Sequence, residues 1–250
     1  MLSRIFITLY GLVCYAIGIV AIAYAVGFVG NLVVPKTIDS GEPADLQTAL
    51  LFNLPLLGLF AIQHSVMARQ GFKAWWTQIV PKAAERSTYV LFSGLSLILL
   101  YWLWKPLPQT VWMVTSEPLY TGLYVVYFIG WGLVLLSTFL INHFELFGLQ
   151  QVFANLTGRE PAAASFKTPL LYRIVRHPLY MGLLIAFWVT PHMSVGHLIF
   201  AAATTGYIII GAWLEERDLA TVFGDTYRHY KQRVPMVVPF TRVRRMRRPD

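Results

Sequence analysis

Charged residues are scarce in this 250-residue sequence, at 13% of the chain, whereas hydrophobic residues make up 56%. Soluble domains carry roughly 25% charged residues, so a soluble domain is excluded. Several apolar runs reach the length of about 20 residues that a bilayer-spanning helix needs. The sequence therefore predicts an all-α polytopic membrane protein that forms a single domain over residues 1–250.

Cysteine is almost absent as well. The one cysteine, Cys14, lies inside the first apolar run, which excludes an intrachain disulfide, and we interpret it as a small packing residue. The six histidines show no spacing that is typical of a metal site, and we expect no metal.

The apolar runs predict about five transmembrane spans. Four lie within residues 1–142, in this order: 5–34, 46–68 (with a kink at Pro55), 87–104 and 119–142. A tight helical hairpin counts as the fifth, with arms at 179–190 and 198–214 and a turn at 191–197. The first arm is too short to cross a hydrocarbon core of about 30 Å, so we expect the hairpin to enter and leave on one side. Residues 143–250 hold this hairpin and a cytosolic C-terminal helix.

The distribution of Lys and Arg predicts the orientation of these spans. Of the 20 basic residues, all except Lys36 and Lys105 fall on one side of the membrane. We therefore expect both termini in the cytoplasm. Because the net charge of +8 has this one-sided distribution, it favours contact with anionic lipid over nucleic acid. The segment RVRRMRR at 242–248 is interpreted in the same way.

A cationic pair stands directly before a proline in IVRHPLYMGL, residues 174–183. Pro178 suits the first position of a helix. The N–H groups of Leu179 and Tyr180 then become donors at a positive helix end, which favours an anion, and Arg176 strengthens the attraction. An Arg–His pair anchored at the membrane interface explains this stretch equally well.

A second polar stretch follows the hairpin. Two acids stand where the last apolar run ends: Glu215 and Glu216. We expect Gly224 to end this helix and Asp225 to cap a new one. Three residues share roughly one face of the new helix: Tyr227, Tyr230 and Arg233. They would enclose a ligand with cationic and anionic groups, although periodicity alone favours an interfacial helix with a tyrosine belt.

Two other spans end in polar residues. INHFELFGLQQVF (141–153) contains His143 and Glu145, which are two residues apart and so point away from each other. An ionisable pair at membrane depth is a functional candidate, and a polar helix terminus is the equal alternative. FAIQHSVMAR (60–69) contains His64, for which a packing role is the favoured interpretation.

Taken together, RHPLYMG, the hairpin and EERDLATVFGDTYRHYKQRVPMVVP resemble the isoprenylcysteine carboxyl methyltransferase superfamily. The shared order is RHPxYxG, a hairpin and EExxLxxxFGxxYxxYxxRVPxxxP. It covers roughly the last 75 residues, and every element of it is present. FAIQHSVMARQGFKAWW and LINHFELFGLQQVF are similar to the small bacterial branch that methylates methanethiol to dimethyl sulfide. The QHSxMAR element also resembles NnrU-like membrane proteins, where the full C-terminal signature is not expected.

The resemblance implies a site for S-adenosylmethionine (SAM) that faces the cytosol, in the inner membrane of a bacterium. Carried over by position, the start of the cofactor pocket is His177, Pro178, Tyr180 and Gly182. The residues that close it are Glu215, Glu216, Tyr227, Tyr230 and Arg233. The anion-site argument adds Arg176 and Leu179. A carboxylate acceptor suits the ribose hydroxyls of SAM, and an aromatic face suits its sulfonium.

The implied reaction is S-methylation of methanethiol, with S-adenosylhomocysteine as the second product. Because the thiolate is the nucleophile, a base or a cation is needed. The candidate bases are His143, Glu145 and His64, with Arg176 or Arg233 as electrostatic support. The alternatives are a membrane methyltransferase for a prenylcysteine carboxylate or a lipid, an isoprenoid or sterol reductase, and a non-enzymatic NnrU-like protein. We expect a small thiol and membrane lipids as partners, and neither nucleic acid nor an obligate protein partner.

Overall fold

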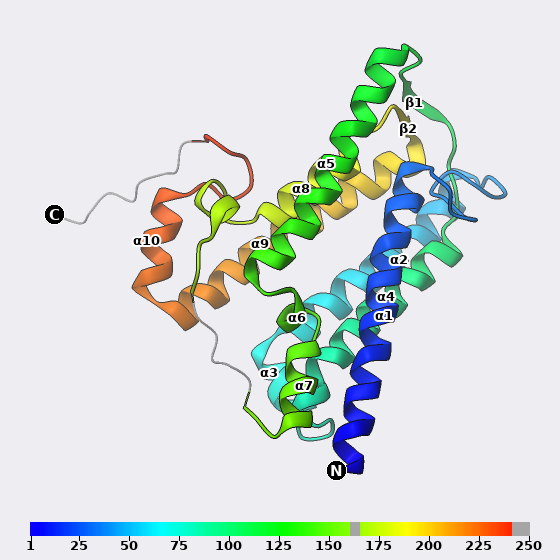
Figure 1. Ribbon diagram of the computed structural model, residues 1–250. Helices are drawn as coiled ribbons and strands as arrows, with labels where there is room; N and C mark the ends of the chain where they lie inside the picture. The colour runs from blue at the N-terminus through cyan, green and yellow to red at the C-terminus, as the bar shows by residue number, and fades with distance from the viewer. Residues whose placement is uncertain (161–165, 242–250) are drawn as a thin grey trace. The chain divides into compact units, whose positions relative to one another are not determined.

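The computed structural model describes residues 1–160 and 166–241, which form helices and two short strands (Figure 1). The elements are α1 (Leu2–Gly30), α2 (Leu46–Ala68), α3 (Gln70–Trp76), α4 (Lys82–Leu103), β1 (Thr110–Met113), α5 (Glu117–Ile141), α6 (His143–Leu146), α7 (Leu149–Thr157), the 3₁₀ helix η1 (Leu170–Arg173), α8 (Pro178–Trp188), β2 (His192–Ser194), α9 (Val195–Phe223) and α10 (Asp225–Arg233). The all-α prediction is confirmed. The predicted lipid contact at 242–248 lies outside the described residues.

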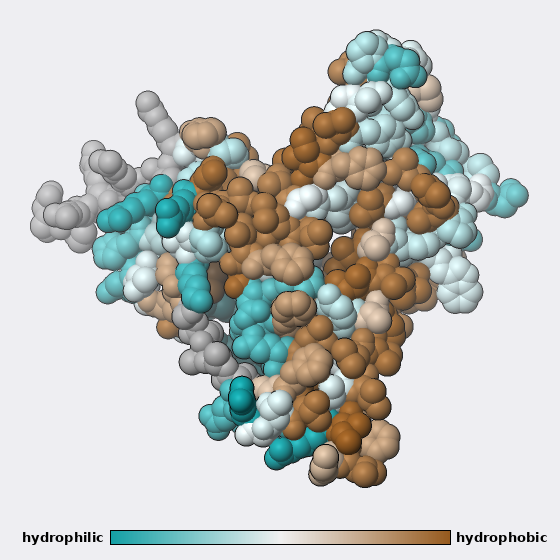
Figure 2. All heavy atoms as spheres, viewed as in Figure 1, coloured by the Kyte–Doolittle hydropathy of each residue, from teal (hydrophilic) through white to brown (hydrophobic). Residues whose placement is uncertain are grey.

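Five of the described helices are long and apolar enough to cross a membrane: α1, α2, α4, α5 and α9. The protein is thus a multi-pass membrane protein. Four of these helices correspond to the four predicted spans, and the fifth, α9, is one arm of the predicted hairpin, whose other arm is the shorter apolar helix α8. Figure 2 shows hydrophobic side chains, in brown, along α1 and the middle of α5, and hydrophilic ones, in teal, around α10. Outward-facing apolar residues such as Phe6 and Leu135 are what helices in contact with lipid present.

Several ends of the spans differ from the predictions, and the third span, α4, begins at Lys82 rather than at residue 87. The first helix ends at Gly30 rather than at residue 34, because Asn31 adopts a left-handed conformation with φ of 53° and caps the helix with its N–H on the carbonyl of Gly27. The hairpin has unequal arms, since α8 has 11 residues whereas α9 has 29 and continues well beyond the apolar run. Residues 192–194 of the predicted turn form β2, which pairs antiparallel with β1, and α9 begins at Val195.

The chain divides into two compact units. The first comprises Met1–Thr115, Asn142–Ala163 and Pro191–Ala203, and the second comprises Ser116–Ile141, Ala164–Thr190 and Thr204–Asp250. The fourth predicted span therefore belongs to the same unit as α8, so the predicted division after residue 142 does not coincide with these units. That the whole chain forms a single domain stays a prediction.

In the first unit, α1 packs against α4, and α2 packs on the same helix. An aromatic cluster lies at one end of this packing: the ring of Phe28 is 4.8 Å from that of Tyr101 and 6.0 Å from that of Trp104. Trp104 also donates its indole N–H to the carbonyl of Ile38, which fixes the loop after α1. Cys14 is fully buried in this unit, in agreement with its predicted packing role.

In the second unit, α8 packs closely along α5. Glycine is required on both helices at their contact: a Cβ on Gly182 would lie 2.6 Å from the carbonyl oxygen of Gly130, and a Cβ on Gly130 would lie 2.8 Å from that of Gly182. Because both obstacles are backbone atoms, a side chain at either position forces the helices apart. This contact fixes the helix that begins with the RHP motif.

Candidate functional site

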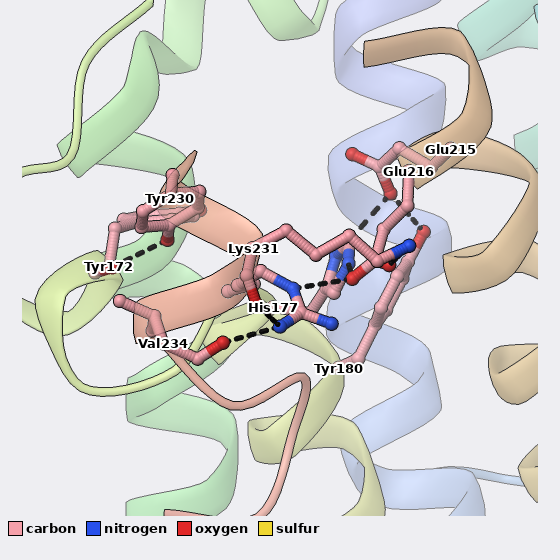
Figure 3. Close-up of polar contacts among 9 residues, drawn as sticks. Tyr172, His177, Tyr180, Glu215, Glu216, Tyr230, Lys231 and Val234 are labelled. Carbon is pink, nitrogen blue, oxygen red and sulfur yellow. Dashed lines mark hydrogen bonds and ion pairs between the residues drawn. The ribbon is translucent and has the colours of Figure 1, made fainter. Parts of the chain in front are cut away.

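The carboxylate of Glu216 is the centre of a buried ionic cluster in the second unit (Figure 3). Its side chain is 3% exposed, and Arg176 Nε lies 2.6 Å from Oε1 while Lys231 Nζ lies 2.7 Å from Oε2. The Nε2 atom of His177 is 3.3 Å from Oε1. These four residues come from α9, α10 and the segment that leads into α8. A buried carboxylate is tolerated only with such partners, so the cluster ties the three segments together.

Arg176 binds the end of α10 as well as Glu216. Its guanidinium donates to the carbonyls of Lys231 and Val234, which lie at the C-terminal end of that helix, where a cation is favourable. Its backbone N–H donates to the carbonyl of Pro235 at 2.9 Å, and that of His177 donates to the carbonyl of Met236 at 3.0 Å. The RHP and RVPM motifs, far apart in the sequence, are therefore joined through their backbones.

The ring of His177 lies between the two acids. Its Nδ1 is 3.6 Å from Oε2 of Glu215, and the ring stacks on that of Tyr180 with centroids 5.2 Å apart. Tyr180 in turn donates its hydroxyl to Oε2 of Glu215 at 2.9 Å (Figure 3). His177 thus contributes its ring as well as its backbone to the local structure.

The two adjacent glutamates have different surroundings. Glu216 is enclosed by cations, whereas the side chain of Glu215 is 45% exposed. Consecutive residues on a helix point in different directions, which separates the two carboxylates. Glu215 is the acid that retains an accessible oxygen for a ligand.

Aromatic residues lie next to the ionic cluster. The ring of Phe166 is 5.8 Å from that of Tyr227 and 5.4 Å from that of Tyr230, whose hydroxyl donates to the carbonyl of Tyr172. Burial raises the pKa of Tyr230 to about 12 and also raises the pKa of Tyr227, so both are neutral hydroxyls at pH 7. The hydroxyl of Tyr227 is buried and has no hydrogen-bond partner among residues 1–160 and 166–241.

The structure places the other predicted residues of this region as follows. Pro178 is the first residue of α8, as predicted, and Leu179 is the second. Gly182 lies at the contact with α5, and Arg233 is exposed at the end of α10. Gly224 does end α9, but the prediction that Asp225 caps the next helix is wrong. Gly224 occupies the cap position, and Asp225 is the first helical residue, with its carboxylate 3.0 Å from Arg228.

Sequence reasoning missed Lys231 and Tyr172. The position of Lys231 carried a usable signal, because it follows Tyr227 by four residues and so shares its face of α10. Tyr172 gave no such signal, since it acts through its backbone carbonyl in a short 3₁₀ helix.

The predicted bases belong to the first unit. His143 begins α6, is 4% exposed and has its Nε2 2.9 Å from the hydroxyl of Tyr15. Burial lowers its pKa, which favours the neutral imidazole. Glu145 has other partners: its backbone N–H donates to the side chain of Asn142, which donates in return to the Glu145 carboxylate at 3.0 Å.

Both ring nitrogens of His64 have partners on α4. Its Nε2 is 2.7 Å from the hydroxyl of Tyr89, and its Nδ1 is 3.1 Å from Oγ of Ser93. The ring also stacks on that of Phe60, with centroids 5.1 Å apart. These contacts suit the packing role that was the favoured interpretation of His64.

Curated relatives match over most of the chain. Methanethiol S-methyltransferase 1 of Bradyrhizobium diazoefficiens is 58% identical over 243 residues, which cover 96% of this chain and 85% of that protein. Methanethiol S-methyltransferase of Mycobacterium tuberculosis is 48% identical over 239 residues, which cover 96% of this chain and 98% of that protein. Nurim of Sus scrofa is 33% identical over 180 residues, covering 68% of each chain. No family model and no solved structure matches the chain.

Proposed function

The chain belongs to the methanethiol S-methyltransferase family, and we propose that it transfers a methyl group from SAM to methanethiol, giving dimethyl sulfide and S-adenosylhomocysteine. The observation that carries this proposal is the 58% identity over 96% of the chain with a relative named for that reaction. The proposal includes a site that faces the cytosol, with both termini cytoplasmic, in the inner membrane of a bacterium. The one-sided distribution of Lys and Arg supports this orientation.

The residues of the second unit suit a cofactor with a sugar, a carboxylate and a sulfonium. The exposed oxygen of Glu215 suits ribose hydroxyls, which donate hydrogen bonds. The buried hydroxyl of Tyr227 has a donor to offer to a polar ligand atom, and an unpaired buried hydroxyl is otherwise costly. Glu216, Arg176 and Lys231 then serve to hold these groups in place rather than to contact the ligand.

When bound, SAM supplies a methyl group activated by the positive sulfonium. The chain must provide alignment and a thiolate, because a thiol is a weak nucleophile. We assign the removal of the thiol proton to His143, since a neutral buried imidazole accepts a proton and a protonated one does not. Glu145 and His64 are the alternative candidates, and their side chains have partners in the first unit, as that of His143 has in Tyr15.

Purified protein in detergent tests this proposal by headspace gas chromatography with SAM and methanethiol. We expect dimethyl sulfide in proportion to enzyme and time. Parallel reactions with a prenylcysteine and with phosphatidylethanolamine should give no methylated product. Methylation of either of these, without dimethyl sulfide, would contradict the assignment of substrate. SAM binding by calorimetry on the same sample shows whether a negative result concerns the substrate or the cofactor.

A further inference from the structure

The first unit holds a groove between α1 and α4, which no residue of the ionic cluster lines. It has a volume of about 230 Å³ and is lined by one cation, Lys36, and by six other residues: Val20, Ala21, Tyr24, Ile98, Tyr101 and Trp102. Val20 and Trp102 are mostly exposed, so the groove opens on a surface that faces lipid. An apolar groove of this kind accepts a hydrocarbon chain.

The chain after α1 folds back to place Lys36 at this groove. The backbone N–H of Lys36 donates to the hydroxyl of Tyr24 at 3.1 Å, and that hydroxyl donates to the carbonyl of Lys36 at 3.0 Å. Lys36 thus lies beside a residue that is six positions before the end of α1, which is about 9 Å along the helix. Its ammonium donates to the carbonyl of Trp102, near the C-terminal end of α4.

The hydrogen bond that caps α4 does not use every donor of the Lys36 ammonium. An ammonium has three donors, and the contact with Trp102 takes one of them. Lys105 adds a second positive charge that acts on Lys36, while its own ammonium lies 5.4 Å from the centre of the Phe52 ring. Burial and the charge of Lys105 both lower the pKa of Lys36. An anion at this position would relieve the repulsion between the two cations.

We propose that the groove binds one anionic phospholipid, with its phosphate on Lys36 and one acyl chain between α1 and α4. A lipid supplies both parts of the ligand that the groove calls for, an apolar chain and an adjacent negative charge. The two lysines select a headgroup with net negative charge, because the amine of a zwitterionic headgroup meets the same positive field. This site does not depend on the proposed methyl transfer.

Native mass spectrometry of the delipidated protein tests the proposal with phosphatidylglycerol and phosphatidylcholine of identical acyl chains. We expect the wild type to retain phosphatidylglycerol more tightly, and Lys36→Gln to weaken that binding about fivefold, as expected for one basic residue near an anionic lipid. Lys36→Arg should keep it. Lys82→Gln is the matched control, because it removes one exposed lysine from the other end of α4.

Val20→Trp tests the apolar part of the groove separately from the charge of Lys36. The larger side chain fills part of the groove from its lipid-facing side. It should weaken the binding of both lipids while leaving the melting temperature unchanged. Equal affinity of the wild type for the two lipids would overturn the proposal, as would a Lys36→Gln variant that binds like Lys82→Gln. If Lys36→Gln fails to fold through loss of the α4 cap, undiminished phosphatidylglycerol binding by Val20→Trp would still overturn it.

Discussion

The polar residues of the two units are organised in opposite ways. In the second unit, one buried carboxylate, Glu216, is surrounded by Arg176, Lys231 and His177. In the first unit, His143 and His64 are each bonded to a tyrosine hydroxyl. An ionic cluster needs all of its members, since each charge left alone is costly, whereas a neutral hydrogen bond contributes modestly. Substitutions should therefore harm folding most in the second unit.

The largest expected effect is that of Glu216→Gln. It leaves Arg176 and Lys231 without their buried counter-charge and should lower the free energy of unfolding by about 3–5 kcal/mol. Thermal unfolding in detergent measures this loss. The matched control is Glu215→Gln, at the exposed neighbour, which should keep the melting temperature and raise the KM for SAM. If the two variants unfold alike, the distinction between the two acids is wrong.

The next effect concerns His143, the proposed base in the first unit. If His143 is the base, His143→Ala should lower kcat/KM by about 10²–10⁴-fold. Because burial lowers the pKa of His143 from 6.5, wild-type activity should be constant above pH 6.5 and fall as the pH drops through this lowered pKa and the imidazole gains a proton. The rate of dimethyl sulfide formation against pH measures this. An acid limb that persists in His143→Ala would assign the base to another group.

The contact between α5 and α8 gives a smaller effect. Gly182→Ala places a Cβ 2.6 Å from the carbonyl of Gly130 and should cost about 1–3 kcal/mol of stability. Gly122→Ala on α5 is the matched control, because, apart from its chain neighbours and the backbone of its own helix, no described atom lies within 4 Å of the new Cβ. Circular dichroism melts of the two variants are the measurement. Equal melting temperatures would show that the two helices separate easily.

The smallest effect is expected at His64. Ser93→Ala removes one partner of Nδ1 and should lower the free energy of unfolding by about 1 kcal/mol, with turnover unchanged. A large loss of turnover in a stable Ser93→Ala variant would instead indicate that His64 takes part in the reaction.

Much of the fold was predictable because apolar length and helix signals agree. The second span matches its predicted bounds, 46–68, since Asp45 accepts a hydrogen bond from Thr48 and so begins the helix. The C-terminal end of α9 was predictable from Gly224 but not from hydropathy, because Glu215 and Glu216 end the apolar run while the helix continues to Phe223. The helix ends at Gly224, where the backbone leaves the helical conformation, and not at the first charged residue.

The residues of the candidate site could be proposed from motifs, but their contacts could not be predicted from the sequence. The methanethiol branch, which FAIQHSVMARQGFKAWW and LINHFELFGLQQVF indicate, is confirmed by the relatives. The pairing of Arg176 with the carbonyl of Val234 was not predictable. Every residue has a backbone carbonyl, so the sequence does not indicate which one accepts the hydrogen bond. The difference between the two acids also needed the structure, since adjacent glutamates look alike in sequence.

The most direct measurement uses SAM that carries a trideuterated methyl group, with unlabelled methanethiol and purified protein. Mass spectrometry of the headspace should find dimethyl sulfide with one labelled and one unlabelled methyl group, and Glu215→Gln should give less of it at low SAM concentration. Dimethyl sulfide without the label, or none from folded protein that binds SAM, would contradict the proposed methyl transfer.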